Sequence, residues 1–379
     1  MSEKGDKSYF IFAIAISLGV IARFVAMTLG HNYDFESYCI VGEIVGNSRN
    51  VYAETSRYNY APLFSIVQGG FYRFAQFKAE EWKLVFRVLI VGMLTLSDVG
   101  IACCLAKLHS IGAAIFFFLN PVSIIISGYH NQFDNMAILF GVLAVFFYND
   151  STKIKWKDFI FVMMIALSLI MKHIFFMLPI FLLAKKELSF KKKVFYAITP
   201  PTIFLMSFIP YVVQSKEAFL GVLNNVFLYR SYNNAPLLLG LYKLINFPLS
   251  KSFVVYLMLM LIMAYLTRKM NIEETILIYM ISMVAFSSAV ANQYLVIPMA
   301  ALCALNFRYV DKIYMVTVTL FLILSSDGIN LINYGGLRKL PGLIINIFDF
   351  YVQFGYTIAV IVLCFALISY YTRKNNIKL

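Results

Sequence analysis

Residues 9–29 read YFIFAIAISLGVIARFVAMTL, and the only charged side chain among them is that of Arg23. A helix rises by about 1.5 Å per residue, so a helix over this segment spans a hydrocarbon core of about 30 Å. A cleaved signal peptide is the alternative, but its apolar region should extend over only about 7 to 15 residues. We therefore predict an uncleaved first membrane helix.

A polar segment follows at residues 31–43, which read HNYDFESYCIVGE. Asp34 and Glu36 are the first carboxylates beyond the apolar run, at the point where the helix should surface into water. A carboxylate at a membrane surface can act as a general base on an incoming hydroxyl group. We predict that the functional site begins here. The alternative is that these acidic residues only stabilise the N-terminus of an interfacial helix.

The composition indicates a membrane protein throughout. Of the 379 residues, 61% are hydrophobic and 13% are charged, and the mean hydropathy is +0.78. In soluble domains about a quarter of the residues are charged. No polar segment is long enough to bury a core of its own. We therefore predict an all-α, polytopic protein with a single transmembrane domain over residues 1–379.

The net charge of +13 does not indicate a nucleic-acid partner. The basic residues fall mainly in short clusters between apolar runs, where the positive-inside rule places them on the cytoplasmic side. Lys4 and Lys7 accordingly predict a cytoplasmic N-terminus. The five cysteines show no Cys-X-X-Cys spacing, so the sequence predicts neither a metal site nor a disulfide framework.

Threading the chain by its basic clusters gives roughly 12 spans with both termini inside. Residues 31–82 form a long outer segment in which we expect interfacial helices at 36–47 and 62–77. The span expected at 111–127 contains Asn120-Pro121, which weakens a helix. Further spans are expected near residues 84–105, 136–148, 194–213, 253–267, 275–291 and 295–306, with a last one that ends at Arg373.

One apolar tract, residues 159–184, lies between two strongly basic clusters. Two clusters on the same side of a membrane require an even number of crossings between them. We therefore predict that the tract is a pair of short helices that turn at Lys172-His173. Short, interrupted membrane segments are places where substrate sites are built.

This topology brings the polar groups of distant segments to one outer face. Asp34 is expected to act as a base, with Glu36 in a supporting role. Cationic and imidazole groups suit a phosphate, whereas amides and tyrosines suit sugar hydroxyls. The candidates for the phosphate are His130, Lys172, His173 and Arg230, and those for the sugar or the acceptor are Tyr60, Asn131, Gln132, Asp134, Gln293 and Tyr294.

Four motifs occur in a fixed order: Asp34-Phe35-Glu36, Tyr60-Ala61-Pro62-Leu63, the stretch 129–134, and Lys172-His173. This order resembles that of the type C (GT-C) glycosyltransferase superfamily, and most closely the dolichyl-phosphate-glucose glucosyltransferase family of the N-glycan pathway. The resemblance implies a GT-C-like fold, a polyprenyl-phosphate sugar donor, a glycan or glycolipid acceptor, and an inverting transfer with Asp34 as base. It implies no obligatory metal, and we expect no cofactor.

The sequence also departs from the family. The late His-Glu-Lys element of the family is replaced by Asn292-Gln293-Tyr294, and an asparagine of the third motif is replaced by Asp134. The identities of the sugar and the acceptor therefore stay open. The richness in Lys, Ile, Asn and Phe favours a prokaryotic inner membrane, and hence an undecaprenyl carrier.

Two other functions stay open. A lipid-linked-sugar flippase or another transporter should show repeat symmetry and charges that line a midplane cavity. A glycan polymerase or ligase with a lipid-diphosphate donor should rely on several outer arginines. Individual residues also have structural alternatives: His130 as a hydrogen-bonded loop residue, and Lys172 as an anchor at a helix end. Arg23 and Asp98 lie inside predicted spans, so we expect each to pair within the protein.

Overall fold

The computed structural model describes residues 3–77, 80–149, 156–229, 252–307, 309–325, 329 and 342–375. Every regular element within these ranges is a helix, which confirms the predicted all-α class. Among the described residues, four helices are long and apolar enough to cross a membrane, or five if one bent pair counts as a span. These helices indicate a membrane protein. The expected number of roughly 12 spans stays a prediction.

The polar segment after the first helix folds largely as expected. Helix α1 (Glu3–Thr28) is followed by α2 (Asp34–Gly46), α3 (Val51–Glu54) and α4 (Pro62–Gln76). Pro62 occupies the first turn of α4, where its missing N–H group leaves no bond unmade. Helices α2 and α4 approach closely, because a Cβ atom at Gly69 would lie 2.6 Å from Val45 Cγ1. Both interfacial segments predicted to be helical are therefore confirmed as helices.

The span expected at 111–127 is broken. Helix α5 (Trp82–Leu108) leads to α6 (Ile111–Phe118), α7 (Pro121–Ile124) and the π-helical turn η1 (Ile125–Tyr129). The chain bends by 47° between α6 and the segment that begins at Pro121. The Asn120 side chain accepts a hydrogen bond of 2.9 Å from the N–H group of Val122 and so caps α7. The predicted weak point is confirmed.

The pair of short helices is confirmed as well. Helix α8 (Asp134–Asn149) precedes α9 (Lys157–Met171), and a 3-10 turn, η2 (His173–Phe175), then leads to α10 (Leu178–Ala184). Lys172 lies at the break, in an extended conformation with φ −156° and ψ 127°. This backbone geometry ends α9 one residue before the predicted turn.

The second half of the chain adds further helices and turns. Helix α16 (Ile272–Ala285) ends six residues before the end of the span expected at 275–291, because the chain turns at Phe286. The helices and turns described in the second half are α11 (Phe190–Met206), α12 (Ile209–Val212), α13 (Lys216–Val222), η3 (Leu223–Phe227), α15 (Ser252–Thr267), α16 (Ile272–Ala285), η5 (Asn292–Val296), α17 (Ile297–Leu305), α18 (Val310–Leu324) and α19 (Gly342–Lys374).

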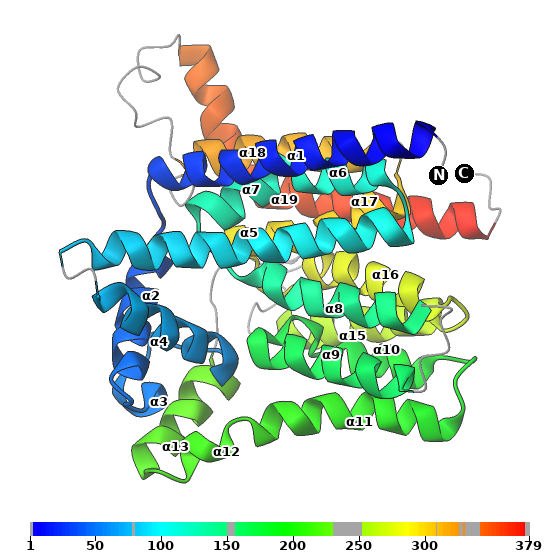
Figure 1. The fold of residues 1–379 in the computed structure, drawn as a ribbon. Coiled ribbons are helices and arrows are strands. Elements are labelled where there is room, and N and C mark those ends of the chain that lie inside the picture. The colour runs from blue at the N-terminus through cyan, green and yellow to red at the C-terminus, as the bar shows by residue number, and fades with distance from the viewer. Residues whose placement is uncertain are drawn as a thin grey trace.

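Figure 1 shows the long helices side by side, with the two chain termini at one end and α2, α3, α4 and α13 at the opposite end. Helix α13 packs directly on α3, since a Cβ atom at Gly221 would lie 1.8 Å from the carbonyl oxygen of Tyr52. The Asn50 side chain also donates a hydrogen bond of 2.9 Å to Gln214. These four helices, which belong to two of the segments predicted to lie outside, thus gather at one end of the bundle.

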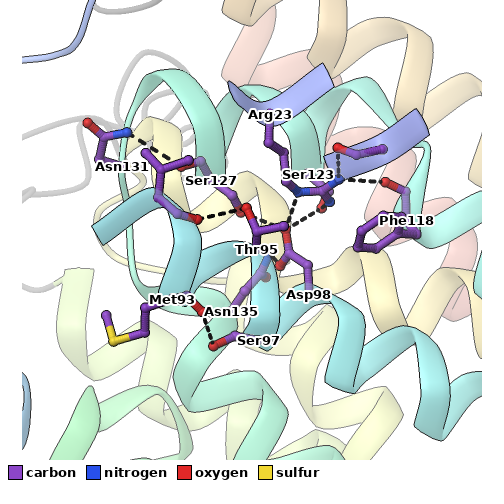
Figure 2. Close-up of polar contacts among 12 residues, drawn as sticks. Arg23, Met93, Thr95, Ser97, Asp98, Phe118, Ser123, Ser127, Asn131 and Asn135 are labelled. Carbon is purple, nitrogen blue, oxygen red and sulfur yellow. Dashed lines mark hydrogen bonds and ion pairs between the residues drawn. The ribbon is translucent and has the colours of Figure 1, made fainter. Parts of the chain in front are cut away.

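Arg23 and Asp98 pair with each other inside the bundle. Arg23 Nε lies 2.8 Å from Asp98 Oδ2, and both side chains are fully buried (Figure 2). Arg23 also donates hydrogen bonds of 3.0 Å to the carbonyl groups of Gly19 and Phe118. The expectation that each charge pairs within the protein is confirmed.

Candidate functional site

Asp34 lies at the start of α2, where its carboxylate is partly exposed. The Gln132 side-chain amide donates a hydrogen bond to Asp34 Oδ2, and Asn32 donates a weaker one of 3.4 Å. The Tyr38 hydroxyl donates to Gln132 Oε1 over 3.3 Å, which orients the amide. A carboxylate next to the first helix and a glutamine 98 residues further on are therefore held together.

His130 lies beside this pair and is fully buried. Its Nδ1 atom is 3.2 Å from Asn32 Nδ2, so Asn32 contacts both Asp34 and His130. Within the described ranges, His130 Nε2 has no hydrogen-bond partner. Burial lowers the pKa of His130 to about 4, because desolvation disfavours the imidazolium. At neutral pH His130 is therefore uncharged and can offer hydrogen bonds but no charge to a phosphate.

Lys172 and Asp134 form the second part of the site. Lys172 Nζ lies 2.6 Å from Asp134 Oδ2, and the two side chains are 4% and 0% exposed. The ammonium group also lies 4.6 Å from the ring centre of Phe133 and 5.0 Å from that of Tyr60. The predicted phosphate-binding lysine is thus already neutralised by a carboxylate predicted to contact the sugar.

Aromatic residues surround this ion pair. Tyr60 packs edge-on against Phe133 at 4.9 Å, and its ring centre lies 6.0 Å from that of His173. The Tyr294 hydroxyl on η5 interacts electrostatically with Lys172, Tyr60 and Asp134. Burial lowers the pKa of His173 to about 4, with a further contribution from Lys172, so this imidazole is also neutral at neutral pH. Tyr60, Asp134, Lys172, His173 and Tyr294 therefore come together.

Several predicted residues lie outside this cluster. Glu36 points to Lys83 and His31, at 3.5 and 3.9 Å, rather than toward Asp34, as expected for residues two apart on a helix. The Asn131 side chain is occupied by the loop: its Nδ2 donates to Gly128 over 2.7 Å, and its Oδ1 accepts from Arg87 over 3.0 Å.

Two further predicted residues need a separate account. Gln293 is partly exposed on η5, next to Tyr294. Arg230 lies outside the described residues. The roles assigned to Gln293 and Arg230 therefore stay predictions, as do those of the residues that the structure brings together.

Two arginines near the site were missed at the sequence level. The exposed Arg57 guanidinium lies 4.4 Å from the ring centre of Tyr33, directly before Asp34. Among the described residues no carboxylate lies within ion-pair distance of it. Arg87 donates to the carbonyl group of Gly30 and to Asn131, so it joins the two site segments. The signal for Arg87 was a basic residue inside an apolar helix; for Arg57 it was only the polar turn at 56–60.

The site contains buried polar atoms that lack a partner among the described residues. They are His130 Nε2, Asp134 Oδ1 and His173 Nδ1. A buried polar group without a hydrogen bond costs about 1 to 3 kcal/mol, so such atoms indicate a place for a polar ligand or for water. The described residues include no group of three His, Cys, Asp or Glu side chains that could hold a metal ion.

Comparisons with known proteins give no assignment. No family model, no curated protein and no solved structure matches the chain. The likeness in motif order to type C glycosyltransferases therefore stays a prediction. The contacts of the site residues are the basis on which a function can be proposed.

Proposed function

We propose that the protein is an inverting glycosyltransferase of the GT-C type. It transfers a hexose from a polyprenyl-phosphate carrier to a lipid-linked or glycan acceptor on the non-cytoplasmic face of the membrane. One observation supports this most: a partly exposed carboxylate, Asp34, is held by the same loop that carries Asp134, the partner of Lys172. A carboxylate close to the first helix and a lysine at the break after α9 are thus connected through one short stretch of chain.

Asp34 is the proposed general base. Its partial exposure leaves room for an acceptor hydroxyl within about 2.6 to 3.2 Å, while Gln132 and Asn32 fix its orientation. As Asp34 takes the hydroxyl proton, the acceptor oxygen bonds to the anomeric carbon of the sugar. The bond from that carbon to the phosphate oxygen breaks on the opposite side, which inverts the configuration and releases the polyprenyl phosphate.

The leaving phosphate gains negative charge in this step, so cations beside it lower the barrier. Lys172 supplies one charge, which it shares with Asp134. Arg57 is a second candidate, since it is exposed, lies over the ring of Tyr33, and is able to bind a phosphate with two parallel hydrogen bonds. His130 and His173 are neutral at neutral pH and are proposed to contribute hydrogen bonds only.

The sugar is proposed to lie against the unpaired polar atoms of the site. Asp134 Oδ1 can accept a hydrogen bond from a hydroxyl group, and His173 Nδ1 can donate or accept one according to the tautomer of the ring. Tyr60 supplies an aromatic wall beside them. Exposed apolar side chains of α4, such as Ile66 and Phe74, lie at the same end of the bundle and suit the lipid tail of the carrier.

The test is a transfer assay with purified protein, membrane lipid extract and a panel of labelled polyprenyl-phosphate hexoses. We expect the wild-type protein to transfer label from one donor. Asp34→Asn should lower the rate by at least about 100-fold, the usual contribution of a general base. Glu36→Gln is the matched control, because Glu36 lies on the same helix and points away, and it should retain most of the activity.

Other outcomes contradict the proposal in distinct ways. Equal rates for wild type and Asp34→Asn would show that Asp34 is not the base. If no donor is consumed and intact lipid-linked glycan crosses the bilayer of reconstituted vesicles, the protein is a transporter. If label moves only from lipid-diphosphate donors, it is a polymerase or ligase.

A further inference from the structure

Asp98 is the centre of the buried network shown in Figure 2. Its Oδ2 atom accepts a hydrogen bond of 2.8 Å from Arg23 Nε. The same oxygen accepts hydrogen bonds from the hydroxyl groups of Ser123, at 3.2 Å, and Ser127, at 2.7 Å. The other carboxylate oxygen, Oδ1, accepts a hydrogen bond of 2.5 Å from Asn135 Nδ2. A carboxylate suits these four contacts because it is acceptor-only, whereas an amide would direct one NH₂ group at a donor.

Two of these contacts lie at the ends of one loop. Ser127 directly precedes residues 128–134, and Asn135 directly follows them. These residues comprise the end of η1, residues 130–133 and the first residue of α8, and are here named the site loop. The site loop carries His130, Gln132 and Asp134. Asp98 therefore binds the chain where it enters the site loop and where it leaves it.

The site loop is also fixed at its middle and against the first helix. Asn131 adopts a positive φ of 58° and accepts a hydrogen bond from Arg87, which lies on the same helix as Asp98. A Cβ atom at Gly128 would lie 2.5 Å from the carbonyl oxygen of Arg23, so the loop starts in direct contact with α1. Helix α5 thus holds the loop through Asp98 at both ends and through Arg87 at its centre.

We propose that Asp98 is a positioning residue that sets the location of the site loop. By holding Ser127 and Asn135, it places Gln132 beside Asp34 and Asp134 beside Lys172. Arg23 supplies a counter-charge beside the fully buried Asp98 carboxyl group. That Asp98 fixes the loop is independent of the proposed function, whereas its effect on transfer rests on that function.

Ser123 provides a matched control. Its hydroxyl donates to the same Asp98 oxygen as that of Ser127 and accepts from Arg23 Nη2 at 2.7 Å, but Ser123 lies on α7, away from the loop ends. Ser123→Ala and Ser127→Ala therefore remove the same chemical group from the same carboxylate. A merely structural network would respond similarly to both substitutions, whereas a loop anchor would respond to Ser127→Ala.

The experiment is hydrogen–deuterium exchange of the purified full-length protein in detergent, read on peptides that cover residues 128–134. We expect Ser127→Ala and Asn135→Ala each to accelerate exchange there by about tenfold, since each loses one buried hydrogen bond. Ser123→Ala should leave these peptides at the wild-type rate. Unchanged loop exchange in both anchor variants, or an equal increase in all three, would overturn the proposal. The anchor variants Ser127→Ala and Asn135→Ala remove neutral groups and keep the Arg23–Asp98 ion pair. The experiment therefore does not need an Asp98→Ala variant, in which Arg23 would be buried without a counter-charge.

A transfer assay then tests the link to Asp34. If Ser127 acts through Gln132, Ser127→Ala should lower kcat in the wild-type background and add no further loss to Gln132→Ala. Additive losses would show that Asp98 does not act through Gln132. If hydrogen exchange changes as expected but neither the wild type nor any variant transfers sugar, the loop-positioning role stands and the proposed function is wrong.

Discussion

Lys172 Nζ lies 2.6 Å from Asp134 Oδ2, and this pair joins the break after α9 to the first residue of α8. Both side chains are almost completely buried. The pair also borders the aromatic rings of Tyr60 and Phe133, so its position determines the shape of the candidate site. The balance of charge between Lys172 and Asp134 therefore affects both the stability of the fold and the shape of the candidate site.

The first prediction concerns this balance. Lys172→Met leaves the Asp134 carboxylate buried without a counter-charge, which should destabilise the protein by about 3 to 5 kcal/mol. The apparent unfolding temperature in detergent should fall accordingly. Lys172→Met combined with Asp134→Leu should recover much of the loss, because no buried charge remains. Equal stability of wild type and the single variant would mean that the ion pair does not form.

The second prediction concerns Arg57. If it binds the donor phosphate, Arg57→Ala should raise KM for the donor by about tenfold or more, the effect of losing a charge-assisted hydrogen bond. Arg49→Ala is the control, because Arg49 is also exposed but pairs with Glu54 at 2.5 Å. Steady-state kinetics at varied donor concentration distinguishes the two. A similar KM in both variants would remove Arg57 from the site.

The third prediction concerns pH. Burial lowers the pKa of His130 to about 4, against 6.5 when it is unperturbed. Between these values the unfolded chain binds more protons than the folded chain, so His130 makes the protein less stable as the pH falls from about 7 toward 4. His130→Gln should reduce this loss by up to about 3 kcal/mol, measured as unfolding at several pH values. An unchanged pH dependence of unfolding in His130→Gln would contradict this prediction.

The fourth prediction concerns the packing of α13 on α3. Gly221→Ala would bring a methyl group to 1.8 Å from the Tyr52 carbonyl oxygen, so one of the two helices must move. We expect a lower unfolding temperature and faster hydrogen exchange in residues 51–54. At Gly70, which has no atom within 4 Å of an added Cβ, alanine should stabilise α4 by up to about 1 kcal/mol. A neutral Gly221→Ala would show that α13 does not contact α3 in this way.

Local features of this fold were predictable because they have local causes. The break at Asn120-Pro121 follows from the missing N–H group of proline, and α4 begins at Pro62 for a related reason. The turn at Lys172 followed from counting basic clusters on one side of a membrane. The short helix α3 and the turn η3 were missed, because a single turn carries too weak a periodic pattern to be recognised.

The partners within the site were less predictable. Arg23 and Asp98 were each expected to pair, since an isolated charge is costly in lipid, but only the packing of α1 on α5 shows that they pair with each other. Likewise, the sequence suggested Lys172 and Asp134 as separate ligand contacts, whereas the fold brings them together as an ion pair. Choice of partner depends on long-range geometry, which no local pattern encodes.

The π-helical turn η1 has a consequence for the number of residues that the chain needs before His130. Such a turn contains one residue more than an α-helical turn, and each residue of a helix advances its face by about 100°. Deleting a single residue between Ile125 and Tyr129 would remove the wide-turn hydrogen bond of 2.9 Å from the N–H group of His130 to the carbonyl group of Ile125, and so change the path of the chain toward His130 and Gln132. Length in this short stretch is therefore under tighter constraint than the identity of its apolar side chains.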